Sequence, residues 1–274
     1  MDTKIDVMRL LWLSLLVVFA SCNPRLNTSL SNVVKEQITG EAFYQHAMTM
    51  QWKQRDSFAV KEILEGNIPT FLLKLIPINV SVIDSTTRKV NRATYYVIPD
   101  YLSVGNNHNW ARVPLTPMAA QLIADSLNCF LPTRKMVNDI YTNAVVKLAP
   151  VPMYIHRDST VTMWQHHLII EGQRKQQKGL IAGIKKDVVI SDLLVRSPKT
   201  NRVAIYGWHQ LNGKPIQPLY IGHVNWYVDY SHGIRLVARK VKVNGKWMDF
   251  TKVMEHPILK KLLTDESVGD MTRY

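Results

Sequence analysis

The chain has 274 residues, and its 34 lysines and arginines outnumber its 21 aspartates and glutamates to give a formal net charge of +13. Because 46% of the residues are hydrophobic, the chain can bury a sizeable core, as one large domain or two small ones. This composition excludes a disordered chain, a collagen-like repeat and a coiled coil. A multi-pass membrane protein is also excluded, since no apolar run reaches about 18 residues.

Residues 1–21 have the pattern of a signal peptide. An apolar run from Leu10 to Ala20 follows a short basic head, and it is too short to span about 30 Å of bilayer hydrocarbon. The sequence FASC, which ends at Cys22, resembles the lipobox of bacterial lipoproteins. That resemblance implies a lipid on Cys22, which becomes the first residue of the mature chain. The alternatives are an ordinary signal peptide with an incidental cysteine, or a buried apolar helix.

The mature chain is predicted to consist of a lipidated tether over 22–32 and a single domain over 33–274. The tether is polar. No acidic cluster follows Cys22, so we expect an anchor in the bacterial cell envelope that faces the periplasm rather than the cell surface. With Cys22 lipidated, Cys129 is the only thiol left and no intramolecular disulfide can form.

The first half of the domain is predicted to change from one helix to strands and then to helices. Apolar spacing predicts a helix over 33–52, followed by antiparallel strands over 57–64, 71–83 and 87–98 with a hairpin turn at 84–86. Three helices should follow, beginning at Thr116-Pro117, at Thr133 and at Thr160, because threonine and serine are favoured helix caps.

The second half is predicted to be rich in strands. They lie over 185–191, 202–209 and much of 216–250, where Asn244-Gly245 is a hairpin signal, and a short helix over 252–263 closes the domain. The order of strands, helices and strands favours one α+β domain with a mainly antiparallel sheet, a central helical segment and a β-rich C-terminal half.

Histidines gather in the C-terminal half at His209, His223 and His232. Alternation along a strand would place His223, Tyr227 and Asp229 on one face, with His232 just past its end. A histidine beside a carboxylate is the usual pair for general base catalysis. The predicted catalytic residues are therefore His209, His223, Asp229, Tyr230 and His232. The alternative is that these histidines are buried and hydrogen-bonded in the core.

Other polar and aromatic residues near these histidines are predicted to bind a substrate. They are Lys186, Asp187, Trp208, Trp226 and Arg235. The three histidines are also a candidate set of ligands for a divalent metal ion, although their spacing matches no compact zinc motif. No motif in the chain requires a cofactor.

The sequence Ser231-His232-Gly233-Ile234-Arg235-Leu236 resembles the active-site stretch S-H-G-C-[IV]-R-[LM] of the L,D-transpeptidases of the YkuD type. The cysteine that serves this family as nucleophile is absent, so the transpeptidase reaction is not implied. From Asp100 onward the chain is also similar to a class of secreted bacterial proteins without an assigned activity.

Cys129 is a second candidate nucleophile. It comes shortly before a predicted helix start and before Arg134 and Lys135, and both features lower the pKa of a thiol. A cysteine followed by strands that supply histidine resembles the chain order of the NlpC/P60 cell-wall peptidases. The alternative is a small buried hydrophobic residue between two helices.

The strong positive charge indicates a polyanionic partner. In the cell envelope, aromatic and basic side chains together suit peptidoglycan or another anionic polysaccharide, and we expect no nucleic acid partner. The lipid would hold the protein on the membrane. No P-loop, nucleophile elbow or dinucleotide fingerprint is present.

We therefore expect a lipid-anchored hydrolase that acts on an anionic polysaccharide. A uronate lyase with Tyr230 as the proton-transfer group is the second enzymatic reading. A non-catalytic lipoprotein that binds glycans is the alternative from a different class.

Overall fold

The computed structural model describes residues 25–26, 37–267 and 270–274. The predicted signal peptide, Cys22 and most of the tether lie outside the described residues. Among the residues that the structure describes, no helix is long and apolar enough to cross a membrane.

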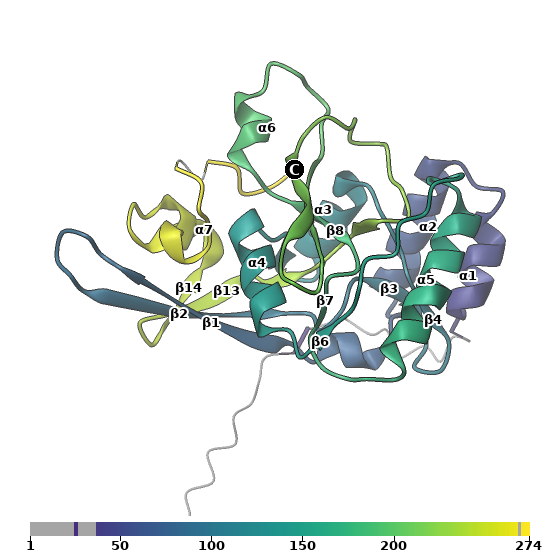
Figure 1. Cartoon of the computed structure of the whole chain (residues 1–274), viewed down its shortest axis with the longest axis horizontal. Coiled ribbons are helices and arrows are strands. Elements are labelled where there is room, and N and C mark those ends of the chain that lie inside the picture. The colour runs from purple at the N-terminus through teal and green to yellow at the C-terminus, as the bar shows by residue number, and fades with distance from the viewer. Residues whose placement is uncertain (1–24, 27–36, 268–269) are drawn as a thin grey trace, which may run out of the picture.

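The larger of the two main sheets has six strands, in the order β14-β13-β2-β12-β5 with β1 also paired to β2. Their bounds are β1 (Ile76–Ile83), β2 (Val90–Val97), β5 (Cys129–Phe130), β12 (Val237–Ala238), β13 (Lys240–Val243) and β14 (Lys246–Asp249). The β1–β2 hairpin extends away from the body of the molecule (Figure 1). Asn244 and Gly245, both with positive φ, close the β13–β14 hairpin as the sequence predicts.

The smaller sheet has four strands in the order β10-β9-β8-β11. They are β8 (Lys186–Val189), β9 (Ala204–His209), β10 (Pro215–Tyr220) and β11 (His232–Gly233). β11 runs parallel to β8, and this register pairs His232 with Lys186 and Gly233 with Asp187. Two short sheets complete the strands: β3 (Ser103–Gly105) with β4 (Trp110–Arg112), and β6 (Val146–Lys147) with β7 (Ile181–Ala182).

Seven α-helices lie within the described residues. They are α1 (Gly40–Ala47), α2 (Trp52–Leu64), α3 (Pro117–Ser126), α4 (Arg134–Asn143), α5 (Thr160–Arg174), α6 (Asp192–Arg196) and α7 (Phe250–Glu255), with 3-10 turns at Thr70–Leu73 and Leu259–Leu262. Thr116, Thr133 and Ser159 cap α3, α4 and α5, which begin where the sequence predicts. In Figure 1, α1, α2 and α5 gather at one side of the molecule with β3 and β4.

The predicted α+β fold is confirmed, but several local predictions are wrong. The helix predicted over 33–52 is interrupted between α1 and α2, and the one predicted over 252–263 is divided into α7 and a 3-10 turn. Residues 57–64 belong to α2 rather than to a strand, because Asp56, Ala59 and Ile63 are buried at helical spacing. Residues 221–231 form a loop with one isolated bridge, between Arg202 and Val224, instead of a strand. This loop nevertheless folds over the edge of the smaller sheet and brings several predicted site residues together.

Candidate functional site

The candidate site lies where β8, β11 and the loop 221–231 meet. Its members come from four separate segments, and the parallel pairing of β11 with β8 fixes two of them against each other. We call this cluster the His232 site. It consists of Arg157, Lys186, His223, Tyr227, Asp229 and His232.

His232 is the most unusual member of the site. Its side chain is buried, and neither ring nitrogen has a hydrogen-bond partner. The ring centroids of His223 and Tyr227 each lie 6.1 Å from its own. Burial lowers the pKa of His232 to about 4, so its imidazole is neutral at pH 7. Buried polar groups are nearly always paired, so an unpaired buried imidazole marks His232 as a candidate functional residue.

Asp229 supplies an ionised carboxylate beside His232. Arg157 Nη2 lies 2.9 Å from Asp229 Oδ2, and the Ser231 backbone N–H donates to Oδ1 at 2.8 Å. Burial disfavours the charge, but His232, the Ser231 hydrogen bonds and Lys186 outweigh it and lower the pKa of Asp229 to about 2. The predicted histidine and carboxylate are therefore neighbours, although no hydrogen bond joins their side chains.

His223 and Tyr227 form the half-buried outer layer of the site, with ring centroids 4.7 Å apart. Burial lowers the pKa of His223. The positive charges of Lys186 and Arg157 lower it further, whereas the negative charge of Asp229 raises it. Burial, reinforced by Asp229, raises the pKa of Tyr227 to about 12. At neutral pH the site therefore presents a neutral imidazole next to a protonated phenol.

Two cations flank this pair. The Arg157 side chain is 41% exposed, and its Nε has no hydrogen-bond partner. Lys186 Nζ lies 5.2 Å from the centroid of the Trp208 ring, and burial lowers its pKa. Trp208 is itself buried, so it supports Lys186 from below and does not offer the exposed stacking face that the sequence suggested.

A second polar layer lies beneath the site. Lys185 is fully buried, donates to the Tyr230 carbonyl and lies with its Nζ 3.2 Å from His166 Nδ1. Burial lowers the pKa of Lys185 to about 7. The Tyr230 hydroxyl accepts a hydrogen bond from Met153 N at 2.6 Å and is sealed in the core. Tyr227, rather than Tyr230, is therefore the tyrosine that a substrate can reach.

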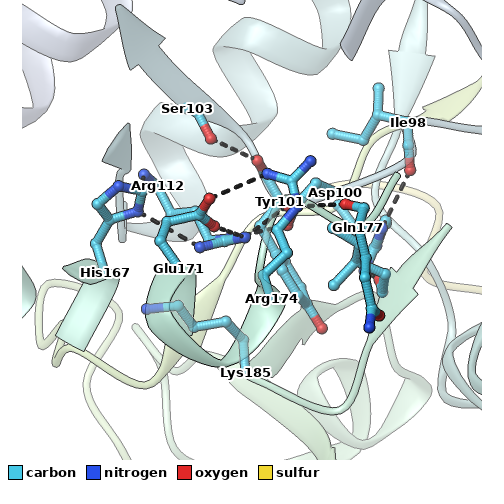
Figure 2. Close-up of polar contacts among 12 residues, drawn as sticks. Ile98, Asp100, Tyr101, Ser103, Arg112, His167, Glu171, Arg174, Gln177 and Lys185 are labelled. Atoms are coloured by element: carbon cyan, nitrogen blue, oxygen red, sulfur yellow. Dashed lines mark hydrogen bonds and ion pairs between the residues drawn. The ribbon is translucent and has the colours of Figure 1, made fainter. Parts of the chain in front are cut away.

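Near Lys185, a buried charged network joins α5 to β4 (Figure 2). Arg112 donates to Asp100 at 2.7 and 2.9 Å and to Glu171 at 2.8 Å. The Nη1 atom of Arg112 lies 3.4 Å from His167 Nδ1. The ionised Arg112 keeps the pKa of Asp100 low despite the burial that opposes its charge. This network positions α5, which carries His166, and nothing in the sequence pattern distinguishes Arg112 or Asp100.

His209 lies apart from the other two predicted histidines. Its ring stacks on Tyr141 with centroids 4.5 Å apart, and its Nε2 lies 3.0 Å from Asn138 Oδ1. Within the described part of the chain, no group of three His, Cys, Asp or Glu residues is placed to hold a metal ion. The metal site suggested for His209, His223 and His232 is therefore not formed.

Three more predicted site residues are structural. Cys129 is buried on β5, and burial raises the pKa of its thiol to about 12, so it does not supply the thiolate that a nucleophile needs. Arg235 is fully buried and donates to the carbonyls of Ile98 and Ile181. Asp187 is sealed beneath the sheet, where it accepts a hydrogen bond from Tyr101 at 2.8 Å.

Sequence reasoning missed Arg157 altogether. It lies in the irregular stretch before α5, where neither periodicity nor a motif marks it. The contact between the buried Lys185 and His166 is likewise not readable from their spacing in the sequence. Trp226, by contrast, is 45% exposed beside the site, as a substrate-binding residue requires.

No protein-family model, curated protein or solved structure matches the chain. The resemblances to bacterial lipoproteins and to the L,D-transpeptidases therefore stay predictions, and the site itself carries the functional argument.

Proposed function

We propose that the chain is a cell-envelope enzyme that acts on an anionic polysaccharide, and that it cleaves the polymer by β-elimination at a uronate unit. The observation that carries this proposal is the contact between the neutral His223 imidazole and the protonated Tyr227 phenol, flanked by Arg157 and Lys186. A base, an acid and cations to neutralise a carboxylate are the groups that this reaction needs.

The reaction follows from these positions. Arg157, whose side chain is 41% exposed, binds the uronate carboxylate, which makes the neighbouring C5 proton more acidic. His223 takes that proton, and the electron pair it leaves forms the C4–C5 double bond. The bond between C4 and the glycosidic oxygen breaks, and the oxygen receives the Tyr227 proton. Asp229 stabilises the imidazolium that forms on His223, because its negative charge favours the protonated ring and opposes the effect of burial on the pKa.

The test is incubation of the purified protein with uronic acid polymers and with peptidoglycan. Elimination gives an unsaturated sugar that absorbs in the ultraviolet, and we expect this product from at least one uronic polymer. His223→Gln should lower kcat by about 100-fold or more. His108→Gln, on an exposed loop, is the matched control and should leave kcat unchanged. Polymer binding without any product would show a binding protein and contradict the enzyme proposal.

Hydrolysis of the same polymer is the second candidate, because His223 is half-buried and feels the charge of Asp229, so its neutral imidazole is placed to activate a water molecule. A hydrolase gives new reducing ends without ultraviolet absorbance, so the product separates the two reactions. In that case His223→Gln should abolish the release of reducing ends, whereas Tyr227→Phe should retain most of it.

A further inference from the structure

A cavity of about 390 Å³ opens next to the His232 site and shares Tyr227 with it. Its wall includes Trp52, Arg55, Asp158 and Trp226. The volume falls in the range of about 300–1,000 Å³ that small-molecule sites occupy. Because Tyr227 belongs both to the His232 site and to the cavity wall, the site and the cavity are adjacent.

The cavity contains an incompletely paired cation. Arg55 is only 4% exposed, yet its Nε has no hydrogen-bond partner. Its other contacts are long: Nη2 lies 3.3 Å from Asp56 Oδ1, and Nη1 lies 3.9 Å from Met163 Sδ. A guanidinium has five N–H donors in a planar fork that matches a carboxylate, and burying it without partners is costly. Arg55 therefore lines the cavity as a cation whose donors the protein leaves incompletely paired, although the Nε atom itself is buried.

Two helices begin at the same cavity. α2 starts at Trp52 and α5 at Thr160, and both residues line the wall. The first N–H groups of a helix have no partner within it, and the helix dipole adds positive potential there. Gln51 and Gln54 form a capping box at α2, and Ser159 accepts from Thr162 N at α5, so the uncapped N–H groups and the two helix dipoles are what reinforce the charge of Arg55.

The rest of the wall suits a sugar ring. Trp52, Trp226 and Tyr227 give it flat aromatic surfaces, and Trp226 is 45% exposed. Asp158 is the acidic side chain of the wall, and its carboxylate can accept hydrogen bonds from sugar hydroxyls.

We propose that this cavity is a subsite for an acidic sugar. The carboxylate of the sugar binds Arg55 and the helix N-termini, and its ring packs against Trp52 and Trp226. The proposal rests on the proposed function for the kind of polymer, and it adds a second point of recognition next to the reacting unit. The subsite selects polymers with acidic groups on neighbouring units over polymers with a single isolated acidic group.

Calorimetric titration with a short galacturonate oligomer tests the subsite separately from catalysis. The same oligomer with its carboxyl groups reduced to alcohols is the neutral probe. We use His223→Gln as the background, so that no turnover occurs. The acidic oligomer should bind at least tenfold more tightly than the neutral one, and Arg55→Gln should remove most of that preference.

Trp226→Ala is the second variant, since an exposed tryptophan can be removed without loss of the fold, and it should weaken both oligomers about tenfold. Trp247→Ala, at another exposed tryptophan on β14, is the matched control and should bind as the parent does. Equal binding of the acidic and neutral oligomers, or unchanged binding after Trp226→Ala, would overturn the subsite. If the wild type makes no product while these binding effects persist, the proposed function fails and the subsite stands.

Discussion

At the scale of single residues, the site depends on burial that keeps two histidines neutral. His232 and His223 both have lowered pKa values, and burial is the largest cause for each. Three of the predicted catalytic residues, His223, Asp229 and His232, meet at the site, because they lie within ten positions of one another in the sequence. The exclusion of His209, Cys129 and Arg235 depends on tertiary packing, which a one-dimensional pattern does not contain.

The neutral state of His223 leads to a prediction about the pH profile of catalysis. The positive charge of Lys186 lowers the pKa of His223, so Lys186→Met should raise that pKa. Activity that requires neutral His223 then falls off at a higher pH in the variant than in the wild type. The measurement is kcat/KM as a function of pH for both proteins. An acidic limb that stays in place in Lys186→Met would rule out His223 as the base.

Gly233 shows how tightly the strand beneath the site is packed. A Cβ at this position would lie 2.5 Å from the Tyr101 ring and 2.7 Å from Lys185 Cβ. Gly233→Ala should therefore lower the free energy of unfolding by about 1–3 kcal/mol, measured by urea denaturation. Gly172→Ala is the matched control, because a Cβ there would meet nothing and alanine is a better helix former than glycine in the last turn of α5. It should keep or slightly raise stability; equal losses in both variants would contradict the packing argument.

At the scale of elements, the ends of helices were the most predictable features. Thr116, Thr133 and Ser159 cap α3, α4 and α5, since short polar side chains bond to free backbone N–H groups from local positions alone. α2 was mistaken for a strand because its mixed polar and apolar sequence hides a buried face. That face includes Asp56, which accepts two hydrogen bonds from Thr116, a contact that sequence spacing does not reveal.

The cap of α4 provides a prediction at this scale. Thr133 accepts from Met136 N at 3.2 Å and also donates to the Leu263 carbonyl, so it joins α4 to the C-terminal segment. Thr133→Ala should cost about 0.5–2 kcal/mol of stability in urea denaturation, with an unchanged m-value. Thr142→Ala, near the end of the same helix and exposed, should change stability by less than about 0.5 kcal/mol. If both substitutions cost the same, the cap has no special role.

At the scale of the whole molecule, the +13 charge and the arrangement of the site point in one direction. The two cations of the His232 site and Arg55 in the neighbouring cavity would all contact an acidic chain bound across Tyr227. The composition predicts a polyanionic partner, and our two proposals put such a chain across Tyr227. Whether lipid on Cys22 holds this surface at the membrane is a separate proposal, which Cys22→Ala would test by release of the protein from the membrane fraction.

The buried histidines should together make the folded protein less stable in acid. Burial lowers the pKa of both His209 and His232 to about 4, whereas a histidine in the unfolded chain titrates near 6.5. Between these pH values the unfolded chain binds more protons than the folded one, so stability falls as the pH drops from about 6.5 to 4. Each histidine should contribute about 2–3 kcal/mol to that loss. Asp187, whose pKa burial raises to about 7, offsets part of it.

Urea denaturation of the wild type at pH 7 and near pH 4 measures the total loss. His209→Gln removes one of the titrating groups away from the His232 site, so its stability should fall less than that of the wild type between the same two pH values. His108→Gln, at an exposed histidine, should lose as much as the wild type. If His209→Gln and His108→Gln lose equal stability, proton uptake at His209 does not couple to unfolding, and the acid sensitivity of the fold must come from other groups.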